Sequence, residues 1–251
     1  MENIYLEQIW QRLPHILSLY DMDKTSSTFG LGDRRFWAWK TIDFGNGIFQ
    51  AANYGISLLL AHNLLPEYIT KESALTYVDS MFYGLDFLID KNGSFSEAFP
   101  YESSFCVTAL VALSCLQTIE NIQNSLDNQK KEQYLALIRR MINFLKTEDE
   151  YHGIISNHLA TACLALYKWN SMTTDTDSLK RSQYFLDRIF CHQSQEGWFL
   201  EYEGADPGYQ TWCMDHLAEL FMSNQDARLK ASLEKAAKFL TYFVHTDGSF
   251  G

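Results

Sequence analysis

The chain has 251 residues, of which 47% are hydrophobic and 15% aromatic, enough to bury the core of a domain of ordinary size. Its formal net charge of −11 argues against a surface for nucleic acids or anionic membranes, because both attract basic patches. Acidic or neutral partners remain compatible with this charge.

The N-terminal segment and the cysteines bear on the cellular compartment in which we expect the protein. Residues 1–20 have an acidic residue at position 2 and lack the pattern of a signal peptide. The most apolar stretch, 106–116, carries Thr and Ser within a helical pattern, so we expect no membrane span. The five cysteines are widely spaced without a CxxC pair, which favours free thiols. Together these features predict a cytoplasmic protein.

The hydrophobic pattern predicts an all-α chain. Apolar residues recur at intervals of three and four, and no run shows the alternation that half-buried strands require. In chain order, we expect helices over residues 3–20, 47–63, 71–89, 104–121, 130–146, 157–169, 178–191, 209–222 and 227–244.

A similar phrase returns at the end of every second helix. It reads IDKNGSF at 89–95, DEYHGII at 149–155, SQEGWFL at 194–200 and HTDGSFG at 245–251. The glycine of each phrase accepts the left-handed backbone geometry that ends a helix. The chain therefore contains an internal repeat whose unit is a helical hairpin.

The two helices of each hairpin differ in character. The helix after each phrase is apolar nearly all round, and the helix before it has a charged face, so we expect the former inside and the latter outside. Stacked hairpins of this kind close into an (α/α)n toroid or extend as an open solenoid. We predict one incomplete toroid domain over 1–251, with four to five hairpins and a truncated C-terminus.

Several polar and aromatic residues are candidates for sugar binding. Arginines can clamp an anionic group and tryptophan faces can stack on sugar rings. The alternative for the first cluster is an N-terminal arm held by its tryptophans. The candidates are Arg34, Arg35, Trp37 and Trp39 in the first cluster, Glu97 and Tyr101 in a second loop, and Trp198, Glu201, Tyr202 and Asp206 in a third.

Three segments resemble the toroid portion of heparinase II/III-like proteins, a family of polysaccharide lyases and relatives found in bacterial surface-glycan biosynthesis. They are GDRRFWAWKTIDFGNGIFQ (32–50), GSFSEAFPYESSF (93–105) and EGWFLEYEGADPGYQTWCMDHLAEL (196–220). The resemblance implies an acidic oligo- or polysaccharide as the partner and uronate β-elimination as the reaction. It also implies a downstream β-rich domain that this chain lacks.

The resemblance further assigns roles to residues. Asn157 and His158 match an Asn-His pair at the start of an inner helix, and Asn157 would bind the uronate carboxylate. Tyr209 matches the tyrosine that serves as the acid and can also serve as the base. The sequence departs from the lyases at the next position, where Gln210 stands in place of a histidine. The structural alternative for Asn157 is a helix cap, for His158 a core residue, and for Tyr209 a packing contact.

Other functions remain open at this stage. Glu201, Glu203 and Asp206 share one loop and could pair as acid and base, as in glycoside hydrolases. Residues 193–198 resemble the Gln-Gly-Trp loops of terpenoid cyclases and prenyltransferases, although no Asp-rich motif accompanies them. A third possibility is a non-catalytic glycan-binding module. We expect no cofactor or metal, because nucleotide-binding motifs are absent and Cys191, His192 and His216 lack the spacing of a zinc site.

Overall fold

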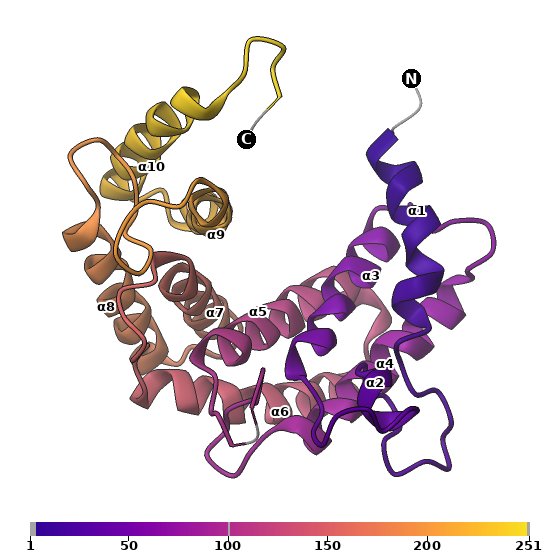
Figure 1. Cartoon of the computed structure of the whole chain (residues 1–251). Coiled ribbons are helices and arrows are strands. Elements are labelled where there is room, and N and C mark those ends of the chain that lie inside the picture. The colour runs from indigo at the N-terminus through magenta and orange to yellow at the C-terminus, as the bar shows by residue number, and fades with distance from the viewer. Residues whose placement is uncertain (1–3, 100, 250–251) are drawn as a thin grey trace. The chain divides into compact units, whose positions relative to one another are not determined.

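The computed structural model describes residues 4–99 and 101–249, and over these ranges it contains ten α-helices and no strand (Figure 1). The α-helices are α1 Ile4–Leu17, α2 Arg34–Trp37, α3 Ala52–Ala61, α4 Lys71–Leu88, α5 Phe105–Ile122, α6 Asn128–Thr147, α7 Ser156–Thr173, α8 Thr176–His192, α9 Pro207–Asn224 and α10 Ala227–Leu240. The chain divides into two compact units, Met1–Phe144 and Leu145–Gly251.

All nine expected helices are present. The helix expected over 47–63 starts as a 3-10 turn, Gly47–Ala51, and the last one ends in another, Thr241–Phe243. The sequence reading missed α2, because four residues are too few to show a helical period. Asn3, the expected first helical residue, and Phe250 and Gly251 of the last phrase lie outside the described residues.

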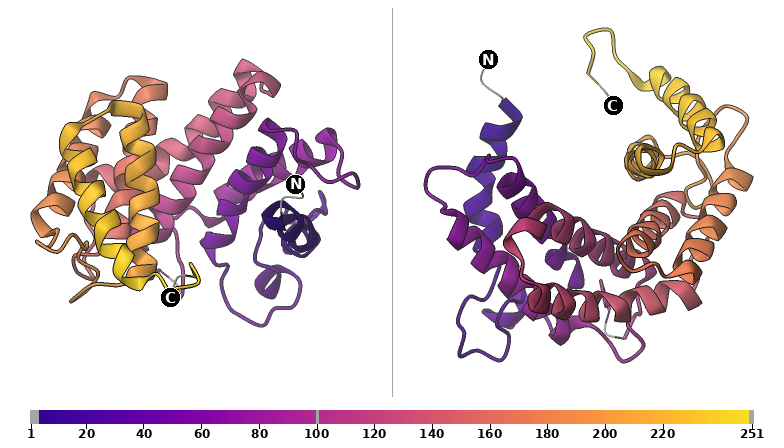
Figure 2. Two further views of the ribbon diagram at one scale, coloured as in Figure 1. Left: turned by 90° about the horizontal axis from the view of Figure 1, so that it is seen from above. Right: turned by 180° about the vertical axis from the view of Figure 1, so that it is seen from behind.

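In the first unit, α3 and α5 lie side by side and α4 packs on α3 (Figures 1 and 2). Most of α5 is buried, in agreement with its apolar sequence. The stretch Phe105–Ser125 is long and apolar enough to cross a membrane, but 78% of its most apolar window is buried inside the structure. Its apolar character is accounted for by its place in the core.

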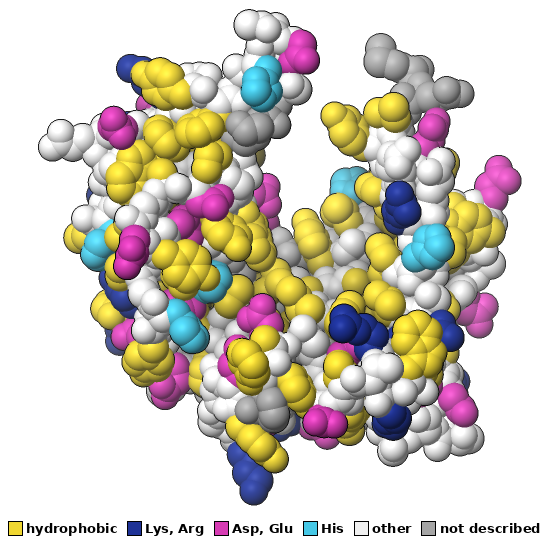
Figure 3. All heavy atoms as spheres, viewed as in Figure 1, with side chains coloured by type: hydrophobic (Ala, Val, Ile, Leu, Met, Phe, Trp, Pro, Cys, Tyr) yellow, Lys and Arg dark blue, Asp and Glu magenta, His cyan; other side chains and the backbone are white. Residues whose placement is uncertain are grey.

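In the second unit, α7 packs against both α8 and α9, and α10 packs on α9. Most of α7 is buried, whereas α8 and α10 keep charged, exposed faces. The expected contrast within a hairpin is therefore confirmed for these helices. On the face shown in Figure 3, basic side chains are interspersed with acidic, hydrophobic and neutral ones.

Three of the four glycine phrases form one recurrent turn, and the phrase at Gly153 does not share it. At Gly93, the amide of Asp90 donates to the carbonyl of Ser94, and the amide of Gly93 donates to the carbonyl of Asp90. The same pair of bonds recurs at Gly197 and Gly248. It also recurs at Gly30, where the chain makes a longer excursion over residues 22–29 before the turn closes. The repeat therefore begins one unit earlier than the sequence phrases indicate.

The turns at Gly93 and Gly197 require glycine for two reasons. Both residues have positive φ, +92° and +107°, which side chains disfavour. A Cβ at Gly93 would lie 2.2 Å from the carbonyl oxygen of Arg140, and one at Gly197 would lie 2.3 Å from that of Lys235. Each turn thus presses its backbone against the outer helix of the next hairpin.

A polar side chain ties three of these turns to the helix or 3-10 turn that follows. The donor is the amide two residues after the glycine. The amide of Gly32 donates to Oε1 of Gln50, that of Phe95 to Oγ1 of Thr108, and that of Phe199 to Oε1 of Gln210, at 2.8, 3.0 and 2.8 Å. Gln210 therefore holds the loop, which gives a structural reason for glutamine after Tyr209.

We expect Gly197→Ala to lower the free energy of unfolding by about 1–3 kcal/mol, because alanine is strained at this φ and meets the carbonyl of Lys235. Gly55→Ala is the control, since Gly55 lies exposed in α3 with open space around it. Alanine there should stabilise by about 0.5–1 kcal/mol. Chemical denaturation measures both values, and equal effects of the two substitutions would contradict this account.

Candidate active site

The first turn of α7 is capped from a distant loop. Its N-cap residue, Ile155, has no side chain that can accept a hydrogen bond. Glu201, in the loop before α9, supplies the acceptors instead: Oε1 accepts from the backbone amide of Asn157 at 2.9 Å, and Oε2 accepts from Nδ2 of Asn157 at 2.7 Å. A backbone bond from Ser156 to Leu200 supports the same junction. The loop before α9 and the start of α7 thus form one structure.

Burial controls the charge of Glu201. The residue is 4% exposed, and burial raises the pKa of its carboxyl to about 7, while the hydrogen bonds from Asn157 act in the opposite direction. The nearby charge of Asp206 raises it further, although by less. A carboxyl group with a pKa near neutrality can give or take a proton at physiological pH.

Asn157 is the second residue of α7 and is 1% exposed. Its Nδ2 donates to Glu201, and its buried Oδ1 has no hydrogen-bond partner among the described residues. The amide therefore receives the cap rather than providing it. It has an unused acceptor beside a carboxyl group that carries a proton for part of the time.

A second acidic group lies close to α7. Nδ1 of His158 lies 2.7 Å from Oε2 of Glu150, and Nδ1 of His152 lies 2.8 Å from Oε1. The Glu150 side chain is 1% exposed, that of His158 is 16% exposed and that of His152 is 74% exposed. Burial disfavours the charged carboxylate, yet the hydrogen bonds from His158 and His152 prevail and lower the pKa of Glu150 to about 2.

This geometry fixes the tautomer of His158. The carboxylate of Glu150 accepts a hydrogen bond from Nδ1–H, which leaves the lone pair of the neutral ring on Nε2. A histidine oriented by a buried carboxylate in this way is suited to act as a general base. The pair Glu150 and His158 therefore has the arrangement of a catalytic dyad.

The remaining candidates of the second unit lie around this centre. Asp206 caps α9, with Oδ1 accepting from the amide of Tyr209 at 2.8 Å. Tyr209 is 40% exposed and stands in the first turn of α9, the helix that packs on α7. Tyr202 is 53% exposed at the tip of the Glu201 loop, and Trp198 donates from Nε1 to Glu196.

The candidates of the first unit form a separate cluster. Trp37 donates from Nε1 to the carbonyl of Leu19, and Arg34 donates to the carbonyl of Ser18. The guanidinium of Arg34 also lies over the ring of Trp39, 5.2 Å from its centre. Trp37 thus holds the N-terminal arm, as the structural alternative expected. Arg34 bonds to a backbone carbonyl of the arm, and Trp39, which that alternative also included, is 59% exposed.

The other candidates of this unit differ in exposure. Arg35 is exposed, and its backbone carbonyl accepts from Thr41. Glu97 accepts a bond from the hydroxyl of Ser104, the residue that caps α5, so its carboxylate supports the helix start. Tyr101 is 91% exposed.

Glu150 and His152 were not among the residues singled out from the sequence. The repeat contained the signal: Glu150 precedes its glycine by three positions, as Asp90 and Ser194 do in their phrases. In the turns at Gly93 and Gly197 this position starts the paired backbone bonds. An alignment of the phrases would have placed Glu150 in the loop that precedes α7.

The described residues contain no group of three or more His, Cys, Asp or Glu side chains arranged to hold a metal ion. His216, on α9, is buried, and neither of its ring nitrogens has a hydrogen-bond partner within the described part of the chain. Burial lowers its pKa. All five cysteines are free, and three of them, Cys115, Cys163 and Cys213, are buried.

Comparisons with known proteins establish the fold. No family model and no curated protein matches the chain. Among solved structures, the crystal structure of D-mannose isomerase matches with a TM-score of 0.60 and 12% sequence identity, over 82% of this chain and 62% of that chain. This chain therefore spans less than two thirds of the length of its structural neighbour.

The likeness confirms the expected all-α fold of the α/α-toroid type. It does not single out heparinase II/III-like proteins, so that resemblance remains a prediction. The same is true of the single-domain assignment.

The pKa of Glu201 predicts how stability changes with pH. The folded chain binds this proton more tightly than the unfolded chain, whose glutamate has the ordinary value of 4.5. The stability that Glu201 gains from binding this proton is fully present below pH 4.5 and is lost as the pH rises through about 7. Between about pH 5 and 8, the wild type should therefore lose stability relative to Glu201→Gln.

Denaturation at a series of pH values measures this difference. Glutamine at position 201 stays neutral over this pH range. If the side-chain amide of Asn157 rotates by 180°, its oxygen can accept a hydrogen bond from the amide nitrogen of the glutamine. Glu203→Gln is the matched control, because Glu203 is an exposed neighbour in the same loop. It should keep the wild-type pH profile. A wild type that gains stability relative to Glu201→Gln over this range would refute the assignment.

Proposed function

We propose that this chain is a carbohydrate-active enzyme that moves a proton at the carbon next to a carbonyl group of a sugar. His158, oriented by Glu150, is the general base, and Glu201 is the second proton-transfer group. The observation that carries the proposal is the 2.7 Å contact between Nδ1 of His158 and Glu150 at the start of α7.

Two further observations support the proposal. D-mannose isomerase shares the α/α-toroid fold, and its name states that it converts an aldose sugar. Glu201 accepts a hydrogen bond from Asn157, the residue before His158 in the first turn of α7. Two acid-base groups that differ in environment are the usual requirement for removing a proton from one position and delivering one to another.

The proposed reaction is the interconversion of an aldose and a ketose. Nε2 of His158 removes the proton from C2, and electrons shift into the carbonyl group to give an enediol. A proton is then delivered to C1, and the hydroxyl proton passes from O2 to O1. The atoms balance without an oxidant or a reductant, so the chemistry needs only proton donors and acceptors.

The proposal predicts that His158→Ala lowers kcat by about 10²–10⁴-fold, because it removes the base. His152→Ala should leave the rate close to wild type, although His152 contacts the same carboxylate. Glu150→Gln should lower kcat and shift the pH profile of the rate, because the histidine loses its charged partner.

The measurement follows aldoses and ketoses by proton NMR in deuterated water, where base action replaces the C2 proton by deuterium even when little product forms. Exchange that His158→Ala leaves unchanged would disprove the role of His158. That role would also be disproved if wild-type protein exchanged the C2 proton of none of a panel of hexoses and pentoses.

Uronate β-elimination is the second candidate, and the order of residues favours it. Asn157, His158 and Tyr209 stand in the first turns of α7 and α9, where the resemblance to lyases places them. This reaction also begins with removal of a proton beside a carboxyl carbon. We rank it second because Nδ2 of Asn157, the group that would bind a substrate carboxylate, already donates to the carboxyl group of Glu201.

Elimination is tested with acidic oligosaccharides by following the ultraviolet absorbance of the unsaturated product. If it occurs, Tyr209→Phe should reduce the rate by roughly 10²-fold or more, since the phenol is the proton donor. Tyr202→Phe, which alters another exposed tyrosine of the same region, should not. A constant absorbance with every uronate substrate would eliminate this candidate.

A further inference from the structure

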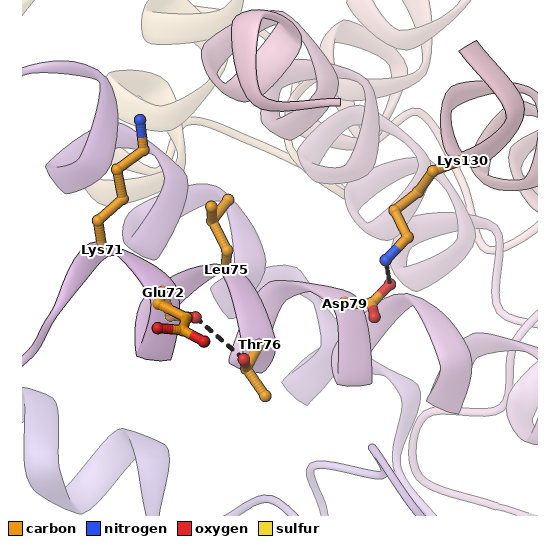
Figure 4. A pocket seen from close by; sticks show the side chains of 6 residues that line it. All are labelled: Lys71, Glu72, Leu75, Thr76, Asp79 and Lys130. Atoms are coloured by element: carbon orange, nitrogen blue, oxygen red, sulfur yellow. Dashed lines mark hydrogen bonds and ion pairs between the residues drawn. The ribbon is translucent and has the colours of Figure 1, made fainter. Parts of the chain in front are cut away.

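Three cavities lie along one helix of the first unit. The first is lined by Leu75, Asp79 and Lys130, among others, and Figure 4 shows Lys130 reaching from α6 to the carboxylate of Asp79 on α4. The second, of about 820 Å³, shares Asp79 with the first, and the third shares Phe87 with the second. Together they make a groove along α4, which we call the α4 groove.

The α4 groove is long compared with a single sugar ring. From Leu75 to Phe87 it follows twelve residues of α4, or about 18 Å at 1.5 Å per residue. One wall of its middle part comes from residues 133–140 of α6. A groove of this length fits a linear ligand better than a compact one.

Aromatic rings occur throughout the middle and far end of the α4 groove. Tyr83 is 70% exposed and Phe87 is 50% exposed, and their positions four residues apart put them on the same side of α4. Each is held by a second ring: Phe29 lies 5.5 Å from Tyr83, and Phe36 lies 5.9 Å from Phe87. The exposed rings are therefore oriented before any ligand arrives.

Two ion pairs line the groove. Asp79 bonds with Lys130 at 2.9 Å, and Asp86 bonds with Arg140 at 2.6 Å. Tyr134 also donates its hydroxyl to Asp79. Paired groups of this kind offer both donors and acceptors beside the aromatic rings. Such a surface complements a ligand that is rich in hydroxyl groups and uncharged.

We propose that the α4 groove binds a linear, largely uncharged oligosaccharide, with sugar rings on Tyr83 and Phe87 and hydroxyl groups on the two ion pairs. The inference goes beyond the proposed function, because it gives the first unit a binding surface for sugar chains in addition to the proton-transfer groups of the second unit. A polyanionic glycan fits less well, since the residues that line the groove include five acidic side chains and three basic ones. An amphipathic helix would leave the ion pairs covered without compensating hydrogen bonds.

The test measures binding by calorimetry with three probes: a neutral linear hexasaccharide, its monosaccharide and a hexasaccharide of uronic acids. The protein carries His158→Ala, so that no probe is consumed. We expect the neutral hexasaccharide to bind most tightly. Tyr83→Ala and Phe87→Ala should each raise its Kd roughly tenfold, because stacking on an aromatic ring is lost.

Two variants control for indirect effects. Phe87→Trp keeps a ring and should retain binding, which distinguishes stacking from loss of fold. Tyr242→Ala removes a tyrosine that is 76% exposed outside the groove and should bind as the parent does. The inference is overturned if the hexasaccharide does not bind, if Tyr83→Ala and Phe87→Ala bind it unchanged, or if the acidic probe binds more tightly.

The outcomes separate this inference from the proposed function. Proton exchange on hexoses by wild-type protein, without hexasaccharide binding, overturns the inference and leaves the function standing. Hexasaccharide binding that depends on Tyr83 and Phe87, without proton exchange on any sugar, supports the inference and overturns the proposed function.

Discussion

The second unit depends on a carboxyl group that caps a helix to which it is not adjacent in sequence. α7 begins at a residue that cannot cap it, and Glu201 supplies both acceptors from the loop before α9. The N-terminus of a helix favours a negative charge, whereas burial disfavours it. The balance leaves the pKa of Glu201 near 7. A contact that joins two hairpins is thereby also a group that can exchange protons.

The surroundings of α7 separate two carboxyl groups by environment. Glu150 and Glu201 are both buried, but Glu150 faces two histidines and Glu201 faces an amide and the charge of Asp206. Their pKa values consequently move in opposite directions, to about 2 and about 7. One group is held as a charged support for His158, and the other changes protonation near neutral pH. This division of roles is the physical basis of the proposed chemistry.

The helices could be predicted from the sequence because hydrophobic period and glycine turns are local signals. The apolar sequences of α5 and α7 predict that these helices are buried, as they are. Every expected helix is present. The first turn of the repeat escaped notice because residues 22–29 separate its two halves. No local pattern could have shown that Gln210 holds a glycine loop, since its partner amide is defined only after folding.

The candidate site was predictable in part for the same reason. Asn157, His158 and Glu201 were recognised by type and position, but their partners were not. The capping of α7 by Glu201 and the orientation of His158 by Glu150 both arise from contacts between separate loops. The structural alternative of Asn157 as a helix cap is wrong, because Ile155 is the N-cap residue and Asn157 donates to the capping group, Glu201.

The excursion between Asp21 and Gly30 has a consequence for engineering. Its closing bonds are the same as those of the turn between Asp90 and Gly93, although the intervening chain is much longer. The two closing bonds therefore accommodate intervening segments of different length. A foreign peptide inserted after Asp90 should be displayed on the surface while the hairpin below it keeps its geometry, which makes these turns suitable for grafting epitopes or fluorescent labels.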